Sequence, residues 1–335
     1  MKAAVLEARD RLISADAALP RLEPGDMLLR MGAAAICGTD IRIWRGRKIK
    51  GVRFPSILGH EFAGEIVEPA GHPGWRTGDR VTICPALPCG TCASCRAGAS
   101  NICDALIAYG YEIDGGFAEF IRVPKAFVEA RNVFRLADGL SFDLAALAEP
   151  LACVINGQSL MGDLEGKSVA VLGTGPIGLL HVMLARHRGA SEVIAVQRSA
   201  HRREAALAMG ADRAVTPDDA GDLSVDCAVV AVGAPELANL AAHIVRPRGR
   251  ISLFAGFPVG VETPFDLNTV HYREQTVTGA FGLTRAQFEE ALGLIAGGDL
   301  PVDRLISHRL DIEHALEAFA LAEQGSALKV VVTNG

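Results

Sequence analysis

The most specific chemical feature of this 335-residue chain is a run of four cysteines: Cys89, Cys92, Cys95 and Cys103. Gly90, Gly98 and small polar residues separate them, so the segment has too little apolar content to fold by itself. Four thiolates held about 2.3 Å from one zinc ion would supply the missing cohesion, and the short spacings let the backbone present several sulfurs to the same ion. The run therefore predicts a closed, structural zinc site.

Disulfide bonds are the alternative interpretation of these cysteines. The chain starts with Met1-Lys2-Ala3-Ala4 and shows no charged-then-apolar signal stretch, so an oxidising compartment is not indicated. We therefore expect zinc rather than disulfides. The remaining isolated thiols are expected to be small buried hydrophobic residues: Cys84, Cys153 and Cys227.

A second group of metal-ligand residue types consists of Cys37 and the pair His60-Glu61. Their spacing is less informative, because Cys37 and His60 are far apart in the sequence and a single histidine is more often a packed or surface residue. A site of this composition can keep one coordination position open, in which a substrate oxygen would be polarised. The two groups thus differ in character, one closed and one open.

Composition limits the class of protein. Half of the residues are hydrophobic and the chain is long enough for two domains with cores of their own. A formal net charge of −6 argues against nucleic acid or an anionic membrane surface as a partner. No apolar run approaches the roughly 18 residues of a membrane-spanning helix. We expect a soluble, cytoplasmic protein.

The order of predicted elements changes near Gly166. Before it, short strands punctuated by Gly and Pro indicate a β-rich domain: 3–5, 27–31, 62–67, 80–84 and 117–123. After it, strands alternate with helices, which predicts an α/β domain with a parallel sheet covered on both faces: 168–172, 177–188, 192–196, 201–209, 226–232, 236–245, 249–254 and 276–279. Two helices at 285–296 and 312–322 and a strand at 329–333 follow, and we expect the strand to return to the first domain.

A glycine-rich turn lies inside the α/β part, between a predicted strand and a predicted helix: Gly173, Thr174, Gly175, Pro176, Ile177 and Gly178. This context is the one that the dinucleotide-binding fingerprint requires. Gly173 would permit the tight turn, Gly175 the approach of the pyrophosphate, and Gly178 the packing of helix on strand. The helix N-terminus would face the phosphates.

The next strand ends in Gln197, Arg198 and Ser199, where an enzyme that prefers NAD would carry an acidic residue. A cationic and hydroxyl-bearing cluster suits the 2′-phosphate of NADP, so we favour NADP and assign Arg198, Ser199 and Arg202 to cofactor binding. The alternative for Arg202 and its neighbour Arg203 is the solvated face of the following helix.

Several motifs together resemble the medium-chain, zinc-dependent alcohol dehydrogenase family, and most closely its polyol (sorbitol-type) branch. They span nearly the whole chain: Cys37-Gly38-Thr39-Asp40, Gly59-His60-Glu61, the four cysteines, Glu149-Pro150-Leu151, the glycine-rich turn, and Arg273-Glu274 ahead of Gly279-Ala280-Phe281. The resemblance implies a β-rich, GroES-like catalytic domain over residues 1–150 and 284–335. It also implies a Rossmann-type, doubly wound domain over residues 151–283.

The resemblance implies that Cys37, His60 and Glu61 bind a catalytic zinc, with Glu149 reaching it through a bound water. Thr39 resembles the family's hydroxyl that passes on the alcohol proton, and Asp40 the residue that orients His60. Where many relatives carry a relay histidine this chain has Arg42, which stays protonated and cannot shuttle a proton. Arg42 is then a candidate for binding cofactor phosphate.

The remaining assignments also come from the resemblance. The cofactor is expected to contact Val232, Gly233, Phe254 and Gly256, and the substrate Arg273 and Trp44. Trp44, Phe54 and Tyr109 could each line the cleft or belong to the core. We expect a small-molecule substrate, a polyol or sugar alcohol, with L-threonine or a simple secondary alcohol as alternatives. A zinc-stabilised dinucleotide-binding protein without turnover is the other class. We expect a homo-tetramer or homo-dimer.

Overall fold

The computed structural model describes residues 1–48, 50–258 and 260–334, which form two compact units. Unit 1 contains Met1–Pro150, Leu283–Gly298 and Leu305–Gly335, and unit 2 contains Leu151–Gly282 and Asp299–Arg304. Residues 299–304, which we expected in the first domain, therefore group with unit 2. The boundary between the two units at Pro150 and Leu151 lies within helix α5 (Ala148–Ser159).

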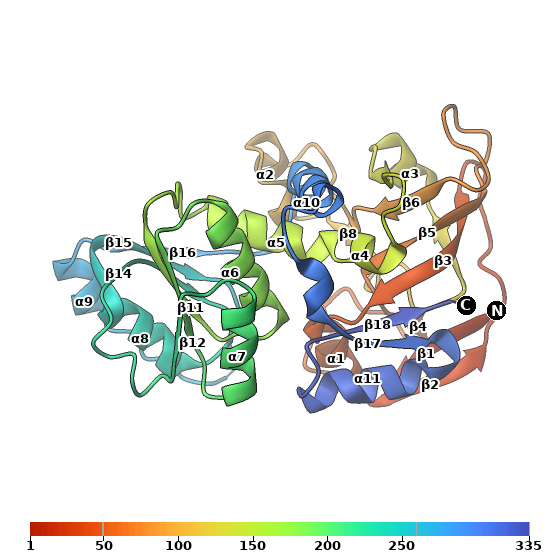
Figure 1. Cartoon of the computed structure of the whole chain (residues 1–335). Helices are drawn as coiled ribbons and strands as arrows, with labels where there is room; N and C mark the ends of the chain where they lie inside the picture. Colours follow the sequence, from red (N-terminus) through yellow and green to blue (C-terminus); the bar gives the residue numbers. More distant parts are fainter. Residues whose placement is uncertain (49, 259, 335) are drawn as a thin grey trace. The chain divides into compact units, whose positions relative to one another are not determined.

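Unit 1 is rich in short strands (Figure 1). Its largest sheet has seven strands: β10 (Val133–Arg135), β6 (Arg80–Ile83), β5 (Glu61–Glu68), β3 (Met27–Ala35), β18 (Lys329–Thr333) and β17 (Ile306–Asp311) in that order, with β9 (Phe120–Val123) on β3. Two smaller sheets are β2 (Arg11–Asp16), β1 (Lys2–Ala8), β4 (Ser56–Ile57), and β7 (Ala86–Leu87) with β8 (Ile107–Ala108). The helices are α1 (Gly38–Trp44), α2 (Ala93–Arg96), α3 (Lys125–Glu129), α4 (Phe142–Ala146), α10 (Arg285–Gly297) and α11 (Ala315–Gln324).

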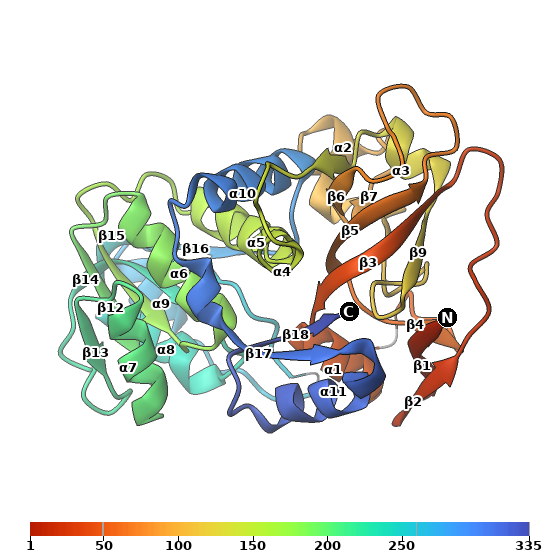
Figure 2. The same ribbon diagram turned by 45° about the vertical axis from the view of Figure 1, so that its right-hand side comes forward.

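The last strand of the chain, β18, lies between β3 and β17 in the seven-stranded sheet. β18 pairs antiparallel with β3 and parallel with β17, so that Val331 lies opposite Ala35 (Figure 2). The strand has the predicted bounds, and its return to the first part of the chain is confirmed. Its run of Val330, Val331 and Val332 is almost completely buried, as expected for a strand covered on both faces.

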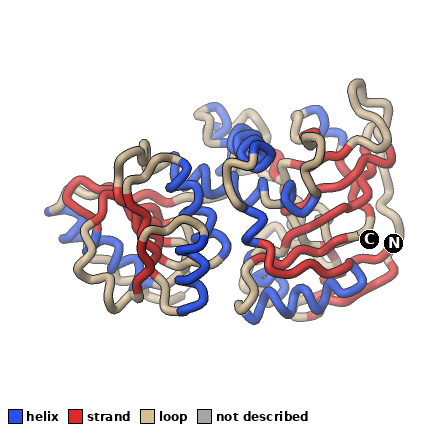
Figure 3. Tube along the Cα trace, viewed as in Figure 1, coloured by secondary structure: helices blue, strands red, loops and turns tan. Residues whose placement is uncertain are grey.

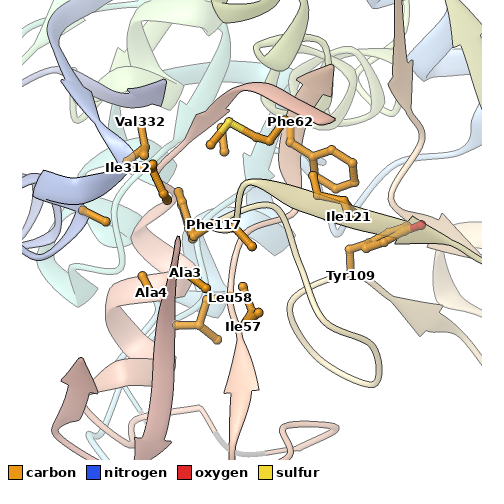
Figure 4. Packing of buried hydrophobic residues seen from close by; sticks show 14 of the residues in the cluster. Ala3, Ala4, Ile57, Leu58, Phe62, Tyr109, Phe117, Ile121, Ile312 and Val332 are labelled. Atoms are coloured by element: carbon orange, nitrogen blue, oxygen red, sulfur yellow. The ribbon is translucent and has the colours of Figure 1, made fainter. Parts of the chain in front are cut away.

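Figure 4 shows how aromatic and branched side chains fill the core of unit 1. Tyr109 packs against Phe62 with 5.0 Å between ring centroids, and Phe117 packs against Phe319 of α11 at 4.9 Å. Both pairs meet edge to face, the arrangement that the ring quadrupoles favour. Tyr109 is fully buried and its hydroxyl donates to the carbonyl of Arg122, so it belongs to the core rather than to a cleft.

Unit 2 is the predicted α/β domain. Its six strands are all parallel, in the order β13 (Arg213–Val215), β12 (Glu192–Val196), β11 (Ser168–Leu172), β14 (Val225–Val230), β15 (Val245–Leu253), β16 (Thr276–Gly279). Numbered along the chain within this unit, that order is 3-2-1-4-5-6, the doubly wound dinucleotide-binding topology. Strands and helices follow one another in Figure 3, and the fold class is confirmed.

The helices of unit 2 cover both faces of its sheet, with α6 (Pro176–His187) and α7 (Ala200–Ala208) on one side and α8 (Pro235–Ile244) and α9 (Leu267–Tyr272) on the other (Figure 1). All five residues of β11 are buried, which explains why its last four residues, Val169–Leu172, are all apolar instead of alternating with polar ones. Across the described residues, no helix is long and apolar enough to span a membrane.

The glycine-rich turn yields a test of the packing. Gly173 has a φ of +91°, and a Cβ on Gly178 would lie 1.9 Å from the carbonyl oxygen of Gly173. We expect Gly178→Ala to lower the free energy of unfolding by at least about 1–3 kcal/mol, since backbone must move to admit the methyl group. The measurement is urea unfolding followed by circular dichroism.

Gly175→Ala is the matched control, because a Cβ there meets no atom within 4 Å and Gly175 has an ordinary φ of −71°. Its free energy of unfolding should stay within about 0.5 kcal/mol of the parent. Equal stability of the two variants would contradict the packing argument.

Candidate catalytic centre

Strand register brings together residues that are distant in the sequence. Ala35, at the end of β3, pairs with Glu61 on one side and with Val331 on the other. Cys37 follows two residues after Ala35 and caps helix α1, whereas His60 immediately precedes β5. The sheet thus places the thiol, the imidazole and the carboxylate at the same end of neighbouring strands.

The three predicted ligands of the open site meet in the structure. One ligand atom from each of Cys37, His60 and Glu61 lies within 4.8 Å of the others. His60 and Glu61 are buried, at 7% and 0% exposure, while Cys37 is partly exposed. Glu61 Oε1 is buried and accepts no hydrogen bond from any residue that the structure describes, so it is available as a ligand.

Asp40 orients the site from the first turn of α1. One carboxylate oxygen accepts a hydrogen bond from the backbone N–H of Cys37 at 2.9 Å, and the other lies 3.5 Å from Nδ1 of His60. The carboxylate is completely buried. With Nδ1 of His60 facing Asp40, Nε2 is the nitrogen that would bind a metal, the usual arrangement for a metal-binding histidine.

Lys329, the first residue of β18, is a member of this centre that sequence reasoning missed. Its Nζ lies 2.5 Å from Oε2 of Glu61, and both side chains are buried. Burial lowers the pKa of Lys329, but Glu61, Cys37 and Glu149 outweigh burial and raise it above the ordinary value. No motif could have indicated a lysine 268 residues after its partner, because only the pairing of β18 with β3 brings them together.

The donor set fits zinc. A soft thiolate, an imidazole and a carboxylate are zinc ligands of the catalytic type, which leaves a position for water or substrate. Burial lowers the pKa of His60, yet Asp40 and Cys37 raise it well above the ordinary value. This direction marks a buried, electron-rich cluster that a bound cation would stabilise.

Thr39 lies beside the ligands, two residues after Cys37, and is 8% exposed. Its hydroxyl oxygen accepts a hydrogen bond from Nη2 of Arg42 at 2.9 Å. A hydroxyl with one acceptor site occupied can still accept one hydrogen bond and donate another. Thr39 therefore keeps the capacity to receive a substrate proton and pass one on.

Glu149 lies in the first turn of helix α5 and is half-buried. It is not one of the three residues whose ligand atoms meet, but its carboxylate raises the pKa of both Lys329 and Tyr111. Glu149 therefore contributes negative charge near the centre. Its contact with metal through water remains a prediction.

The four-cysteine segment also converges. Ligand sulfurs of Cys89, Cys92, Cys95 and Cys103 lie within 4.8 Å of one another, and in the described chain all cysteines are free thiols. Backbone N–H groups point at the sulfurs, for example from Cys89 to Cys103 at 3.3 Å and from Cys92 to Cys89 at 3.4 Å. Hydrogen bonds from the Thr91 and Cys92 backbone N–H groups and the Thr91 hydroxyl lower the pKa of Cys89 to about 6, which favours the thiolate that binds metal.

The isolated cysteines divide into two kinds. Cys84 and Cys227 are buried, and burial raises the pKa of Cys84 to about 12, as expected for an inert packed thiol. Cys153 is partly exposed, so its predicted burial is wrong.

The residues assigned to cofactor cluster at the carboxyl ends of the strands of unit 2. A Cβ on Gly173 would meet the side chain of Val232 at 2.7 Å, and one on Gly233 would meet the carbonyl of Gly256 at 2.3 Å. The turn, the end of β14 and the end of β15 are thus in contact, where doubly wound sheets bind ligands. The Phe254 ring packs edge-on against His181 of α6, which gives it a packing role.

The three arginines that follow β12 make different contacts. Arg203 donates to the backbone carbonyls of Gln197 and Arg198, so it holds the loop and is not merely a solvated residue. The Thr174 hydroxyl donates to the carbonyl of Arg202 at 3.2 Å, which ties the glycine-rich turn to α7. Arg198 itself is exposed, next to the partly buried Ser199.

The structure corrects the substrate assignment of Arg273 and favours the core alternative for Trp44. Arg273 donates to the carbonyls of His243 and Val245, at the C-terminal end of α8 and the amino end of β15. This is the end of the parallel sheet opposite to its ligand-binding edge, so Arg273 stabilises a helix terminus. Trp44 packs edge-on against Phe319 at 6.0 Å and carries the Arg45 guanidinium over its ring, which makes it a packing residue.

Comparison with known proteins identifies the class. Residues 23–131 match the alcohol dehydrogenase GroES-like domain, and residues 176–297 match the zinc-binding dehydrogenase family. Together they cover more than half of the chain. The chain belongs to the zinc-binding, medium-chain alcohol dehydrogenase family, and the predicted family and its two-part fold are confirmed.

Individual relatives have different substrates. The chain is 34% identical to L-threonine 3-dehydrogenase of Pyrococcus abyssi over 328 residues, 93% of this chain and 92% of that one. It is equally identical, 34%, to D-altritol 5-dehydrogenase of Agrobacterium fabrum over 331 residues, 93% of each. A zinc-binding dehydrogenase from Sinorhizobium meliloti, solved bound to NADP, superimposes with a TM-score of 0.92 at 32% identity, covering 99% of this chain and 98% of that one.

The Glu61–Lys329 pair predicts a metal-linked stability effect. Lys329→Met leaves the Glu61 carboxylate buried without a counter-charge, so metal-free protein should lose about 3–5 kcal/mol of unfolding free energy. Zinc would supply the missing positive charge, and saturating zinc should therefore stabilise Lys329→Met more than the parent. Urea unfolding with and without zinc measures both.

The double variant Glu61→Gln with Lys329→Met is the control, because it removes both charges and should recover part of the loss. If zinc stabilised the parent and Lys329→Met equally, this would contradict the argument that zinc supplies the positive charge that Glu61 loses with Lys329.

Proposed function

We propose that this protein is a zinc-dependent oxidoreductase that transfers hydride between a secondary alcohol of a polyol and NADP, with a ketose as the reverse substrate. The observation that carries the proposal is the convergence of Cys37, His60 and Glu61 within 4.8 Å, next to the Thr39 hydroxyl. The family membership supports the same reaction class.

In this proposal Cys37, His60 and Glu61 hold the catalytic zinc, and Glu149 approaches it through water. Bound there, zinc would act as a Lewis acid that lowers the pKa of the substrate hydroxyl. Thr39 accepts the proton of that hydroxyl and donates its own onwards, while Arg42 fixes the orientation of Thr39. Arg42 stays protonated, so the proton must leave by another route.

The cofactor proposal combines the glycine-rich turn with the residues after β12. The helix N-terminus at Gly175 and Pro176 would face the pyrophosphate. Arg198 and Ser199 would bind the 2′-phosphate of NADP. The NADP bound to the Sinorhizobium relative supports this preference over NAD.

A second substrate candidate is L-threonine, which the relative from Pyrococcus abyssi favours. The Agrobacterium relative, which is named for a polyol, D-altritol, has the same 34% sequence identity and supports a polyol substrate. We further propose that the four-cysteine segment holds a structural zinc and that the enzyme is a homo-tetramer or homo-dimer.

The reaction is tested by zinc-loaded protein and a panel of polyols, ketoses and amino alcohols, followed by nicotinamide absorbance with NAD and NADP in parallel. We expect turnover of at least one polyol. Cys37→Ala should reduce kcat/KM roughly a thousand-fold, since the Lewis acid supplies several kcal/mol, while circular dichroism stays unchanged. Cys227→Ala, outside the centre, is the matched control. Absence of turnover with every compound would refute the proposal.

The coenzyme preference is tested at Arg198. We expect Arg198→Ala to raise KM for NADP by about ten- to a hundred-fold, the value of a charge-assisted hydrogen bond, and to change KM for NAD little. Arg248→Ala is the control, because the Arg248 side chain is 84% exposed. Equal changes for the two coenzymes would contradict a 2′-phosphate site at Arg198.

A further inference from the structure

A basic segment follows the first metal-ligand residue in a chain whose net charge is −6: Arg42, Arg45, Arg47, Lys48, Lys50 and Arg53. Arg45 pairs with Asp10 and Glu323, and Arg53 pairs with Asp114. Arg42 and Lys48 differ. Each is hydrogen-bonded to a neutral hydroxyl instead, and neither has a carboxylate within 4.0 Å in the described part of the chain.

Both hydroxyls border the proposed catalytic centre. Arg42 donates to Thr39, two residues beyond Cys37. Lys48 donates to the Tyr111 hydroxyl at 2.9 Å, and the Tyr111 ring lies 5.9 Å from the His60 ring between centroids. The two cations therefore border the centre through two different hydroxyl groups, those of Thr39 and Tyr111. A backbone hydrogen bond from Lys48 N–H to the Arg42 carbonyl keeps them close to each other.

Lys48 is held in an unfavourable position for a cation. Burial and the like charge of Arg42 lower its pKa, and the opposing effects of Cys37, Asp40 and Glu112 are weaker. Asp40 is already engaged by Cys37 and His60, and Glu112 accepts from the backbone N–H of Ala108.

Tyr111 offers no counter-charge to Lys48. Its neutral hydroxyl accepts the hydrogen bond from Lys48, and the Lys48 Nζ lies 4.6 Å from the centroid of its ring. Two adjacent cations with no carboxylate in direct contact among the described residues can recognise an anion, which would offset their repulsion on binding.

We infer that Arg42 and Lys48 bind an anionic group of the substrate, so that the polyol oxidised here carries a carboxylate or a phosphate. This inference rests on the proposed function and narrows its substrate class from neutral sugar alcohols to acidic ones. Arg42 presents a planar guanidinium suited to carboxylate or phosphate oxygens, and Lys48 adds a point charge. The reacting hydroxyl would lie at Thr39, and the anionic group towards Lys48.

The test compares a neutral polyol with the sugar acid and the polyol phosphate of the same carbon skeleton, using the zinc-loaded full chain. We expect kcat/KM for one of the acidic substrates to exceed that for the neutral polyol by about ten-fold or more. The two acidic compounds distinguish a carboxylate from a phosphate preference.

Lys48→Met should raise KM for the preferred acidic substrate about ten-fold and so reduce the ratio of kcat/KM for the acidic substrate to kcat/KM for the neutral polyol. Lys48→Arg keeps the positive charge and should leave this ratio unchanged. Lys50→Met is the matched control, because Lys50 is exposed and two residues away. Calorimetric titration of the acidic compound into each variant, without coenzyme, measures binding independently of turnover.

Three outcomes would overturn the inference: preference for the neutral polyol, equal effects of Lys48→Met on neutral and acidic substrates, or a rise in KM for NADP alone. The last would assign the cations to the cofactor. If no compound is turned over, the proposed function fails. Calorimetric binding that Lys48→Met weakens would then still support the anion site, and absence of binding would refute it.

Discussion

The architecture of unit 1 depends on the placement of buried charge at the ends of β3, β5 and β18. Glu61 and Asp40 are completely buried, and Lys329 is 5% exposed. Removing such groups from water costs several kcal/mol each unless partners compensate. Here the partners come from strands at opposite ends of the chain, so the pairing of β18 with β3 does more than close a sheet. It delivers the cation that makes a buried carboxylate at the centre tolerable.

The same arrangement explains how a stable fold can keep a reactive site. Asp40 has two tasks, since it accepts a hydrogen bond from the Cys37 backbone and faces His60. A single carboxylate thus links the start of α1 to the histidine before β5. Rigid hydrogen-bonded backbone fixes the first side chain, and that side chain fixes the second, so the ligand group is oriented by elements that are themselves buried and well packed.

The sequence alone predicted the features that depend on residues close together in the chain. The strands at 168–172 and 192–196 have the predicted bounds, because their apolar runs Val169–Leu172 and Val193–Val196 between turn residues specify buried parallel strands. The cysteine spacing likewise predicted four sulfurs that meet. Arg273 was misassigned, because a motif position does not reveal which end of a sheet a side chain faces. Lys329 was missed for a related reason, since a buried lysine reads as an ordinary strand residue until its partner is known.

An arginine at position 42, where the family resemblance led us to expect a relay histidine, changes the electrostatics of the proposed site as well as its proton chemistry. A histidine exchanges protons near neutral pH and is uncharged for part of its cycle, whereas an arginine adds a permanent positive charge. With Lys48 close by, this charge makes the region beside Thr39 cationic, while Cys37, Glu61 and Glu149 make the metal side anionic. A substrate that spans the two needs a hydroxyl at one end and negative charge at the other. In our proposal, the absence of a titratable relay group at position 42 and the recognition of an anionic substrate would therefore both follow from Arg42.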